Sequence, residues 1–305
     1  MKNPYKKNTK NVKLLPSFVY YADILGYSTM SRTAINKGKG NRFLKRLRDS
    51  LSSAYKRVKS HSEKYDISFY SVKVFTDNIV IGYPLLNPDF NYGEPELGDM
   101  FSISAEFQAG LTAEGFLIRG GIAYGNHFMD DDIVFGEALL QAIEQDKNGG
   151  APRITLAKSA RNIVEKQLSF YAHKSHSPQN EDLLEDADGK IFLNYLNIAF
   201  IAFPEGRISF KLLEMHRDTI VQGLEKYKGD SGIRAKYLWS ASYHNYIVEE
   251  FLKNHPVQTN PEVDEKYAAA CRNAQKLSKY IIDINSYIAT PSRITKESLG
   301  NKNNF

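Results

Sequence analysis

The fold of this chain is decided by Phe18-Val-Tyr-Tyr-Ala-Asp-Ile-Leu-Gly-Tyr-Ser28 and by Val72-Lys-Val-Phe-Thr-Asp-Asn-Ile-Val-Ile-Gly82. Each stretch is rich in apolar, β-branched and aromatic residues, as a buried strand is, and each contains one aspartate, Asp23 or Asp77, that packing does not require. A buried carboxylate without a partner is unfavourable, so an aspartate at a strand end caps a turn, pairs with a cation or binds a metal. Two such aspartates predict a pair of metal ions.

The residues around both aspartates predict a hairpin and a helix. Ile67–Phe75 and Ile79–Tyr83 flank a short turn, which predicts a hairpin with Asp77 near its tip. Between the two aspartates, apolar residues from Phe43 to Val58 recur every three or four positions and predict an amphipathic helix. We interpret the many basic residues of that helix as a solvated face.

The rest of the chain adds further strands and then helices. Phe116–Tyr124 predicts a strand in which Gly120-Gly121 permits close approach of another backbone. The apolar run Ile191–Phe203 predicts a strand, or a strand followed by a helical turn, and the polar stretch His173–Asp188 before it predicts a mobile loop. Beyond Pro204 the pattern changes to helices. The order of these elements indicates an α+β fold in which helices cover a mainly antiparallel sheet.

Composition places the chain among globular proteins. Of its 305 residues, 42% are hydrophobic and 12% aromatic, which is enough for a packed core. The formal charge of +5 arises from the lysine-rich first 13 residues, so the body is balanced and no nucleic-acid partner is expected. No apolar run reaches the ~18 residues of a membrane span, and the N-terminus lacks the apolar core of a signal peptide. We therefore expect a cytoplasmic protein with no membrane partner.

The same patterns divide the chain into four parts. We expect a basic disordered tail over 1–15, a folded domain over 16–204, a helical extension over 205–290 and a flexible tail over 291–305. Cys271, the single cysteine, lies in a helical stretch of the extension and allows no internal disulfide.

Three motifs in this sequence resemble those of the class III nucleotidyl cyclases, and they occur in the same order. The first is Asp23-Ile-Leu-Gly-Tyr-Ser28, and the second is Lys73-Val-Phe-Thr-Asp77. The third is Phe116-Leu-Ile-Arg-Gly-Gly-Ile-Ala-Tyr-Gly125, followed by Asp132-Ile-Val-Phe-Gly136. The resemblance implies that residues 16–204 form the ferredoxin-like core of that family.

The resemblance also implies a catalytic metal centre. Asp23 and Asp77 would be the catalytic metal ligands, and the Ile24 carbonyl would add a ligand. The cofactors would be two divalent ions, Mn²⁺ or Mg²⁺, for which carboxylate and phosphate oxygens are the preferred ligands. Such a pair lowers the barrier to attack of a ribose 3′-hydroxyl on the α-phosphate.

Nucleotide-binding residues follow from the same motifs. The turn after Asp23 leads into a helix, and its free backbone N–H groups would bind the triphosphate. Lys73 would contact the base, although a lysine whose stem covers an interface is the alternative interpretation. The residues that we expect to bind the nucleotide are Leu25, Gly26, Tyr27, Ser28, Lys73 and Asp132.

Some positions differ from the purine cyclase pattern. Ile133 stands where adenylyl cyclases carry an aspartate, with Asp132 one position away, and a shift of one residue on a strand reverses its face. Leu140 and Glu144 stand where purine cyclases carry an asparagine for the ribose and an arginine for the transition state. Another cation would have to replace that arginine. The candidates are Arg119, Arg153 and Arg161.

These differences, together with Phe75 and Thr76 before Asp77, resemble the pyrimidine cyclases of bacterial Pycsar anti-phage systems. The resemblance implies conversion of UTP or CTP to 3′,5′-cyclic UMP or cyclic CMP, which a separate effector protein reads. A purine (adenylate or guanylate) cyclase and a catalytically inactive, nucleotide-binding module are the alternatives. Because the family places each nucleotide between two cyclase domains and this chain has one set of motifs, we expect a homodimer with shared active sites.

Overall fold

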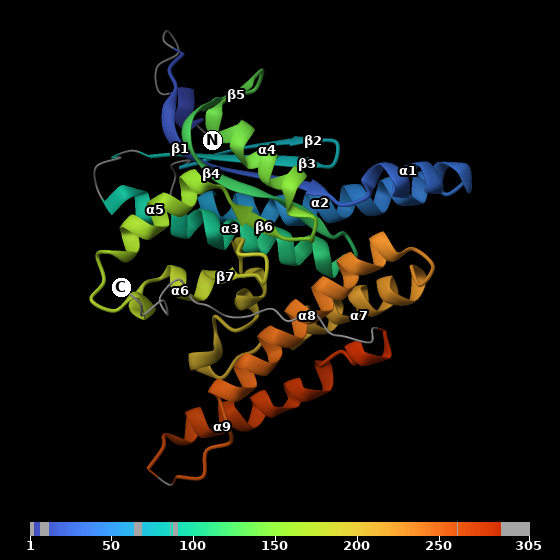
Figure 1. Ribbon diagram of the computed structural model, residues 1–305, viewed down its shortest axis with the longest axis vertical. Helices are drawn as coiled ribbons and strands as arrows, with labels where there is room; N and C mark the ends of the chain where they lie inside the picture. Colours follow the sequence, from blue (N-terminus) through green and yellow to red (C-terminus); the bar gives the residue numbers. More distant parts are fainter. Residues whose placement is uncertain are drawn as a thin grey trace.

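The computed structural model describes residues 3–6, 12–63, 69–85, 87, 91–260 and 262–287. They form one mixed, mainly antiparallel sheet with helices on its faces and a further group of helices beside it (Figure 1), which confirms the expected α+β class. The strands are β1 (Leu15–Ile24), β2 (Ser71–Phe75), β3 (Asn78–Pro84), β4 (Ile118–Met129), β5 (Val134–Gly136), β6 (Ile154–Leu156), β7 (Leu183–Glu185) and β8 (Ile191–Leu193). The α-helices are α1 (Tyr27–Asn36), α2 (Gly40–Glu63), α3 (Glu94–Ala113), α4 (Glu137–Gly149), α5 (Lys158–Leu168), α6 (Gln179–Asp182), α7 (Phe210–Lys226), α8 (Ser231–Asn254) and α9 (Glu265–Ala274).

The strand order places Asp23 at the end of a central strand. The sheet runs β2-β3-β1-β4-β6-β8-β7, and β5 pairs with β4. β1 is antiparallel to both of its neighbours, β3 and β4, whereas β4 and β6 are parallel. Among the first four strands the spatial order is therefore β4-β1-β3-β2, and helices lie in the connections from β1 to β2 and from β3 to β4.

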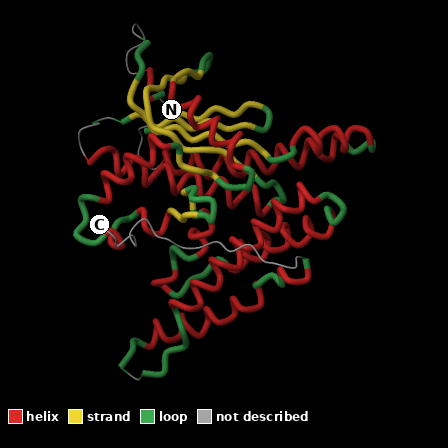
Figure 2. Tube along the Cα trace, viewed as in Figure 1, coloured by secondary structure: helices red, strands yellow, loops and turns green. Residues whose placement is uncertain are grey.

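Side chains along β1 point alternately to the two faces of the sheet, and each face is covered by helices. Phe18 and Tyr20 belong to the core that includes α2 and α3, whereas Val19 and Tyr21 pack with α4 on the other face. Figure 2 shows the strands gathered in one part of the molecule and the C-terminal helices stacked at one side of them. Asp23 continues the series of Val19 and Tyr21 and so lies on the α4 face.

Gly121 brings α4 against the sheet. A Cβ atom at Gly121 would lie 2.6 Å from the Ala142 carbonyl oxygen and 2.5 Å from the Gln145 Cβ, closer than side chains approach. Ala138 and Ala142, the small residues that α4 presents to the sheet, are both fully buried. The expected close approach at Gly120-Gly121 is confirmed, and it brings the end of α4 beside the end of β1.

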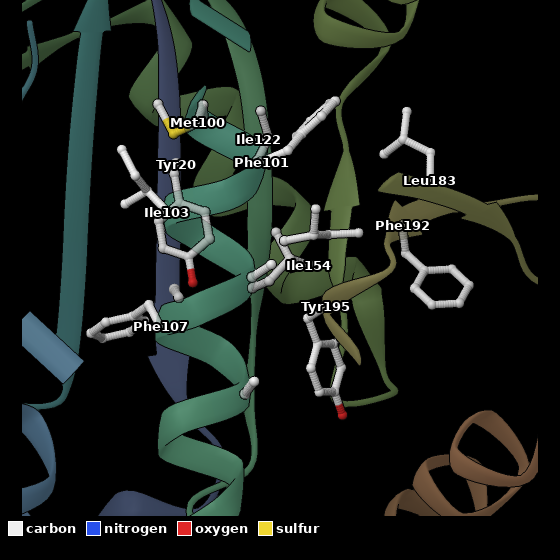
Figure 3. Packing of buried hydrophobic residues seen from close by; sticks show 14 of the residues in the cluster. Tyr20, Met100, Phe101, Ile103, Phe107, Ile122, Ile154, Leu183, Phe192 and Tyr195 are labelled. Atoms are coloured by element: carbon white, nitrogen blue, oxygen red, sulfur yellow. The ribbon is translucent and has the colours of Figure 1, made fainter. Parts of the chain in front are cut away.

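The main core lies between the sheet and α3 (Figure 3). Tyr20 and Ile122 from the sheet meet Phe101 and Phe107 of α3, and none of these side chains is more than 1% exposed. The rings of Tyr20 and Phe107 meet edge to face with a centroid distance of 6.4 Å. Burial of each such residue contributes ~1.5–3 kcal/mol, so this layer fixes the sheet on α3.

The helices after residue 204 share this core. The Tyr243 hydroxyl on α8 accepts a hydrogen bond from the Leu196 N–H at 2.9 Å and donates one to the Asn194 side-chain oxygen at 2.8 Å. Leu213 of α7 and Val248 of α8 belong to the same apolar cluster as the sheet residues. α7 and α8 are thus joined to the sheet by buried contacts.

A chain of hydrogen bonds crosses this junction. The Tyr195 hydroxyl lies 2.7 Å from His216 Nε2, His216 Nδ1 lies 3.0 Å from His244 Nδ1, and His244 Nε2 lies 3.1 Å from the Tyr280 carbonyl oxygen. Because a carbonyl oxygen only accepts, His244 carries its proton on Nε2, His216 donates from Nδ1, and the Tyr195 hydroxyl donates to His216. Burial lowers the pKa of both histidines, to about 4 for His244. The chain therefore requires two neutral rings.

Part of the segment that we predicted as a disordered tail is ordered. Pro4–Lys6 forms a 3₁₀ turn, and the buried Tyr5 donates a hydrogen bond to Ser17 Oγ at 3.0 Å. Tyr5 also packs edge to face on His127 and Phe128, so its aromatic burial outweighs the cost of ordering this short segment. The prediction was wrong for these residues, whereas residues 7–11 and the tail over 291–305 lie outside the described ranges.

The predicted loop over residues 173–188 is also wrong, because it contains α6 and β7. β7 pairs with β8 at the edge of the sheet. The buried Arg153 forms ion pairs with Asp186 and Asp188, and Trp239 Nε1 donates to Asp186 at 2.6 Å. The polar residues that suggested a loop are thus bound to the core. None of the helices in the described part of the chain is long and apolar enough to cross a membrane.

Acid should weaken the fold through the histidine chain. Unfolded histidines take up a proton near pH ~6.5, whereas the buried His244 does so only at about 4. The contribution of the two neutral histidines to the free energy of unfolding is therefore complete above pH ~6.5. It is lost as the pH falls toward ~4, by up to ~1.4 kcal/mol per pH unit for each histidine. We expect urea unfolding between pH ~7.5 and ~5 to depend less on pH in the double variant His216→Phe/His244→Phe than in the wild type.

The matched control is His176→Phe, because His176 is exposed. It should keep the wild-type dependence on pH. An equal slope for the double variant and the wild type would contradict the neutral chain.

Candidate functional site

Asp23 and Asp77 meet at the end of β1. Asp23 lies opposite Asn78 of β3, and the Ile24 N–H donates to the Asp77 carbonyl oxygen at 3.3 Å, which ties the strand to the hairpin turn. The two carboxyl groups are close enough for Asp77 to affect the ionisation of Asp23. Burial, and then the neighbouring Asp77, raises the pKa of Asp23 to about 7. The structure thus brings together both predicted metal ligands.

The hairpin turn holds the Asp77 side chain in a fixed position. Thr76 has φ +52°, a left-handed conformation that costs a β-branched residue ~1–3 kcal/mol. Its hydroxyl donates to Asp77 Oδ1 at 2.7 Å. On the adjoining strand, the Tyr21 hydroxyl donates to Asn78 Oδ1 at 2.6 Å. The contacts of Thr76 and of Asn78, the residues on either side of Asp77, therefore hold the turn against β1.

Arg119 and Asp146 complete the surroundings of Asp23. Arg119 lies directly opposite Asp23 on β4, and its guanidinium is 3.8 Å from Asp23 Oδ2 and 2.8 Å from Asp146 Oδ1. Burial raises the pKa of Asp146, and Arg119 opposes that shift. The guanidinium therefore balances the charge of a cluster of three carboxyl groups.

Sequence reasoning missed Asp146, although a signal was present. Ala138, Ala142 and Asp146 are four residues apart and share the face of α4 that packs on the sheet, where an acid is unexpected. Leu140 and Glu144, which the family comparison pointed to, are exposed on the other side of α4. Asp146 would have been found by asking which residues of the helix face the sheet, instead of which residues match the positions of the family motif.

The turn after Asp23 has the form that we expected. Gly26 has φ +75°, which glycine adopts without strain, and the Leu25 N–H donates to the Leu117 carbonyl oxygen at 2.8 Å. α1 begins directly afterwards at Tyr27, and no side chain caps its N-terminus. The first backbone N–H groups of α1, which include those of Tyr27 and Ser28, are thus without a side-chain acceptor.

Lys73 and Asp132 belong to a second group of residues, at the hairpin formed by β4 and β5. Lys73 Nζ donates to the carbonyl oxygens of Asp130 at 3.1 Å and Asp131 at 2.7 Å, and it lies 5.3 Å from the centre of the Phe75 ring. Asp132 is exposed, with its N–H bound to Asp130 Oδ1 at 2.9 Å. Lys73, on β2, therefore contacts the hairpin on which Asp132 lies.

Of the three arginines considered as a replacement for the missing cation, one lies at the site. Arg153 is bound to Asp186 and Asp188, and Arg161 pairs with Glu165 on the surface. Arg119 contacts Asp23. It is consequently the arginine of the three that can act on a group bound there.

The donor set fits hard divalent cations. Two carboxylates and a neighbouring turn rich in N–H groups suit Mg²⁺ or Mn²⁺, which need only one or two carboxylates when phosphates complete the octahedron. Among the described residues no larger group of histidine, cysteine and acidic side chains has the arrangement of a complete metal site. A cavity of about 690 Å³ between α2, α3 and α7 lies away from both aspartates.

Comparisons with models of known protein families and with the sequences of curated proteins gave no match to this chain.

Removal of Arg119 should destabilise the protein through Asp146. Arg119→Met leaves the Asp146 side chain, only 8% exposed, without its cation, and we expect urea unfolding to show a loss of ~2 kcal/mol. Arg119→Met/Asp146→Leu should recover most of that loss, because the buried carboxylate that depended on Arg119 at 2.8 Å is removed with it. Arg161→Met, which breaks an exposed pair, is the control and should change stability by less than ~0.5 kcal/mol. Equal losses in the single and the double variant would refute this account of the ion pair.

Proposed function

We propose that this protein is a class III-type nucleotide cyclase that uses two divalent metal ions, and that its substrates are UTP or CTP. The proximity of Asp23 to Asp77 carries the proposal. The pairing of Asp23 with Asn78 and the hydrogen bond from the Ile24 N–H to the Asp77 carbonyl oxygen bring the two carboxyl groups together, beside a helix N-terminus that no side chain caps. The order β4-β1-β3-β2 with helices in two connections supports a ferredoxin-like core.

Each residue of the site has a role in this proposal. Two bound divalent ions polarise the ribose 3′-hydroxyl and neutralise the phosphates. Asp23 and Asp77 would hold them, with the Ile24 carbonyl as a further ligand. The N–H groups of Gly26–Ser28 would bind the triphosphate, because the Leu25 N–H already donates to the Leu117 carbonyl oxygen. Asp146 acts through Arg119, which it holds beside Asp23.

The reaction is an intramolecular phosphoryl transfer. The ribose 3′-oxygen forms a bond to the α-phosphorus while the bond from that phosphorus to the β-phosphate oxygen breaks. The products are the 3′,5′-cyclic nucleotide, pyrophosphate and one proton that passes to water. Arg119 is the cation of the site and lies where charge on a transferring phosphate would need to be stabilised.

Exposed apolar residues support a homodimer with shared active sites. Phe75, Ile133, Phe135 and Leu140 are 45–63% exposed and lie on β2, on the β4–β5 hairpin and on α4. We call them the hairpin surface. Lys73 and Asp132 lie beside it, so a two-fold partner bound there brings its own Lys73 and Asp132 toward Asp23 and Asp77 of the first subunit.

The proposed role is synthesis of a second messenger in anti-phage defence. The messenger, cyclic UMP or cyclic CMP, acts on a separate effector protein. Lys73 Nζ lies 5.3 Å from the centre of the Phe75 ring. The pair offers one hydrogen-bond donor and one aromatic face, which suits a small base.

The activity should appear when the protein is incubated with Mn²⁺ and each nucleoside triphosphate in turn. We expect cyclic UMP or cyclic CMP by mass spectrometry. Asp23→Asn and Asp77→Asn should each abolish the product and leave the melting temperature equal or higher, since loss of one of two adjacent carboxylates relieves repulsion. Asp218→Asn, an exposed change on α7, is the control and should keep full activity.

Other outcomes select the alternatives. Cyclic AMP or cyclic GMP as the product identifies a purine cyclase. Binding of nucleotide without any cyclic product identifies an inactive module. The observation that favours this alternative is the Arg119 guanidinium beside Asp23, where it supplies positive charge to the carboxylate without a metal ion. Near-normal turnover in either aspartate variant refutes the metal assignment.

The shared site should be restored by mixing two inactive proteins. Asp77→Ala and Lys73→Ala subunits each lose activity, yet random pairing should recover up to about a quarter of the wild-type rate, because one site per heterodimer is intact. Phe135→Glu should give an inactive monomer by light scattering, since it places a charge in the hairpin surface. Ile201→Glu, at a side chain 69% exposed elsewhere on the molecule, should leave the dimer unchanged. A fully active monomer would contradict shared sites.

A further inference from the structure

A second cavity lies where α1 and α2 meet the end of α7. Its volume is about 460 Å³, within the range of small-molecule sites. Figure 1 shows α1 on the same side of the molecule as the turn that joins α7 to α8. Two regions distant in sequence, α1 with the start of α2 and the end of α7, therefore enclose it, and Asp23 and Asp77 are not among the residues that line it.

The lining of this cavity is strongly basic. It contains five cations and no acidic residue. The cations come from the loop between α1 and α2, from α2 and from the end of α7. They are Lys37, Lys39, Arg42, Arg46 and Lys226.

The charges of these cations are not paired within the part of the chain that the structure describes. Among the described residues no carboxylate forms an ion pair with any of them. Arg46 stacks 4.7 Å from the centre of the Phe116 ring and donates to the Glu114 carbonyl oxygen, so its guanidinium is held in place. Lys226 lies 4.7 Å from the centre of the Tyr227 ring. A concave surface with this much unbalanced charge attracts anions.

We infer that this cavity binds a small polyphosphate anion of nucleotide size. Arginine matches phosphate oxygens with two parallel hydrogen bonds, and lysine adds point charges around them. The Thr29 and Thr33 hydroxyls add neutral donors, and Tyr227 provides an aromatic surface on one wall. Five cations spread over three segments match several phosphate groups rather than one.

The anion site is connected to the turn after Asp23. A smaller cavity of about 180 Å³ shares Thr29, Met30 and Tyr227 with the basic one and is also lined by Leu25 and Gly26. α1 has no fully buried residue, so few contacts fix its position. An anion that bridges α1 and α2 to Lys226 therefore holds α1, and with it the Leu25–Ser28 turn. This last step, the effect on the catalytic turn, rests on the proposed cyclase function, whereas anion binding does not.

Binding is tested with inorganic tripolyphosphate and a chelator, so that no divalent ion can bridge the probe to the aspartates. Calorimetry should show one site per chain, and the melting temperature should rise with the concentration of the probe. Arg42→Gln/Lys226→Gln should weaken binding by about tenfold, because two exposed charges are removed from the site. Lys45→Gln/Arg48→Gln removes the same charge from α2 outside the cavity and should bind as the wild type does.

Two further arms separate this site from the catalytic one. Asp23→Asn/Asp77→Asn should bind tripolyphosphate as well as the wild type, whatever the outcome of the cyclase assay. Hydrogen exchange of α1 and of the end of α7 should slow when the probe is bound.

Equal affinity in the wild type and in Arg42→Gln/Lys226→Gln would overturn the proposal. An equal loss in Lys45→Gln/Arg48→Gln would also overturn it, because the attraction would then be a property of the whole surface. A short oligonucleotide that displaces the probe at lower concentration would overturn the assignment to a small ligand.

Discussion

The candidate site depends on one row of residues across three strands. Asn78, Asp23 and Arg119 lie opposite one another on β3, β1 and β4, on the face of the sheet that α4 covers. A register shift of one residue on β1 would turn Asp23 into the apolar layer of α2 and α3. Burial of Phe18 and Tyr20 in that layer opposes such a shift. The core therefore fixes the position of the carboxyl group.

The charges at the candidate site are balanced through α4, which can lie close to the sheet because Gly121 has no side chain. The close approach of α4 brings Asp146 within 2.8 Å of Arg119, which also lies beside Asp23. Asp23 and Asp77 are like charges, and burial together with the neighbouring Asp77 raises the pKa of Asp23. A divalent cation bound between two such carboxylates would compensate their charge, which is the physical basis of the metal centre that we propose.

The C-terminal helices are part of the same folded unit. Tyr243, His216 and His244 connect them to the β8 segment through buried hydrogen bonds, and Lys226 at the end of α7 supplies one wall of the basic cavity. The extension consequently does more than cover the sheet. It places a cation beside α1, the helix that follows the candidate metal ligands, and so joins the two regions of the chain that carry unbalanced charge.

The sequence by itself determined the local elements around the site: the β1 and β3 strands, the hairpin at Asp77, the turn at Gly26 and the close approach at Gly121. These follow from side-chain alternation, glycine and turn chemistry, which act over a few residues. It also led us to expect that Asp23 and Asp77 meet, through a family resemblance. Tertiary structure decided the rest. Asp146, the ordering of Tyr5 and the division of the basic α2 residues between the cavity and the solvent depend on contacts between segments far apart in the chain. Such contacts are set by packing and charge balance in three dimensions, which no local pattern encodes.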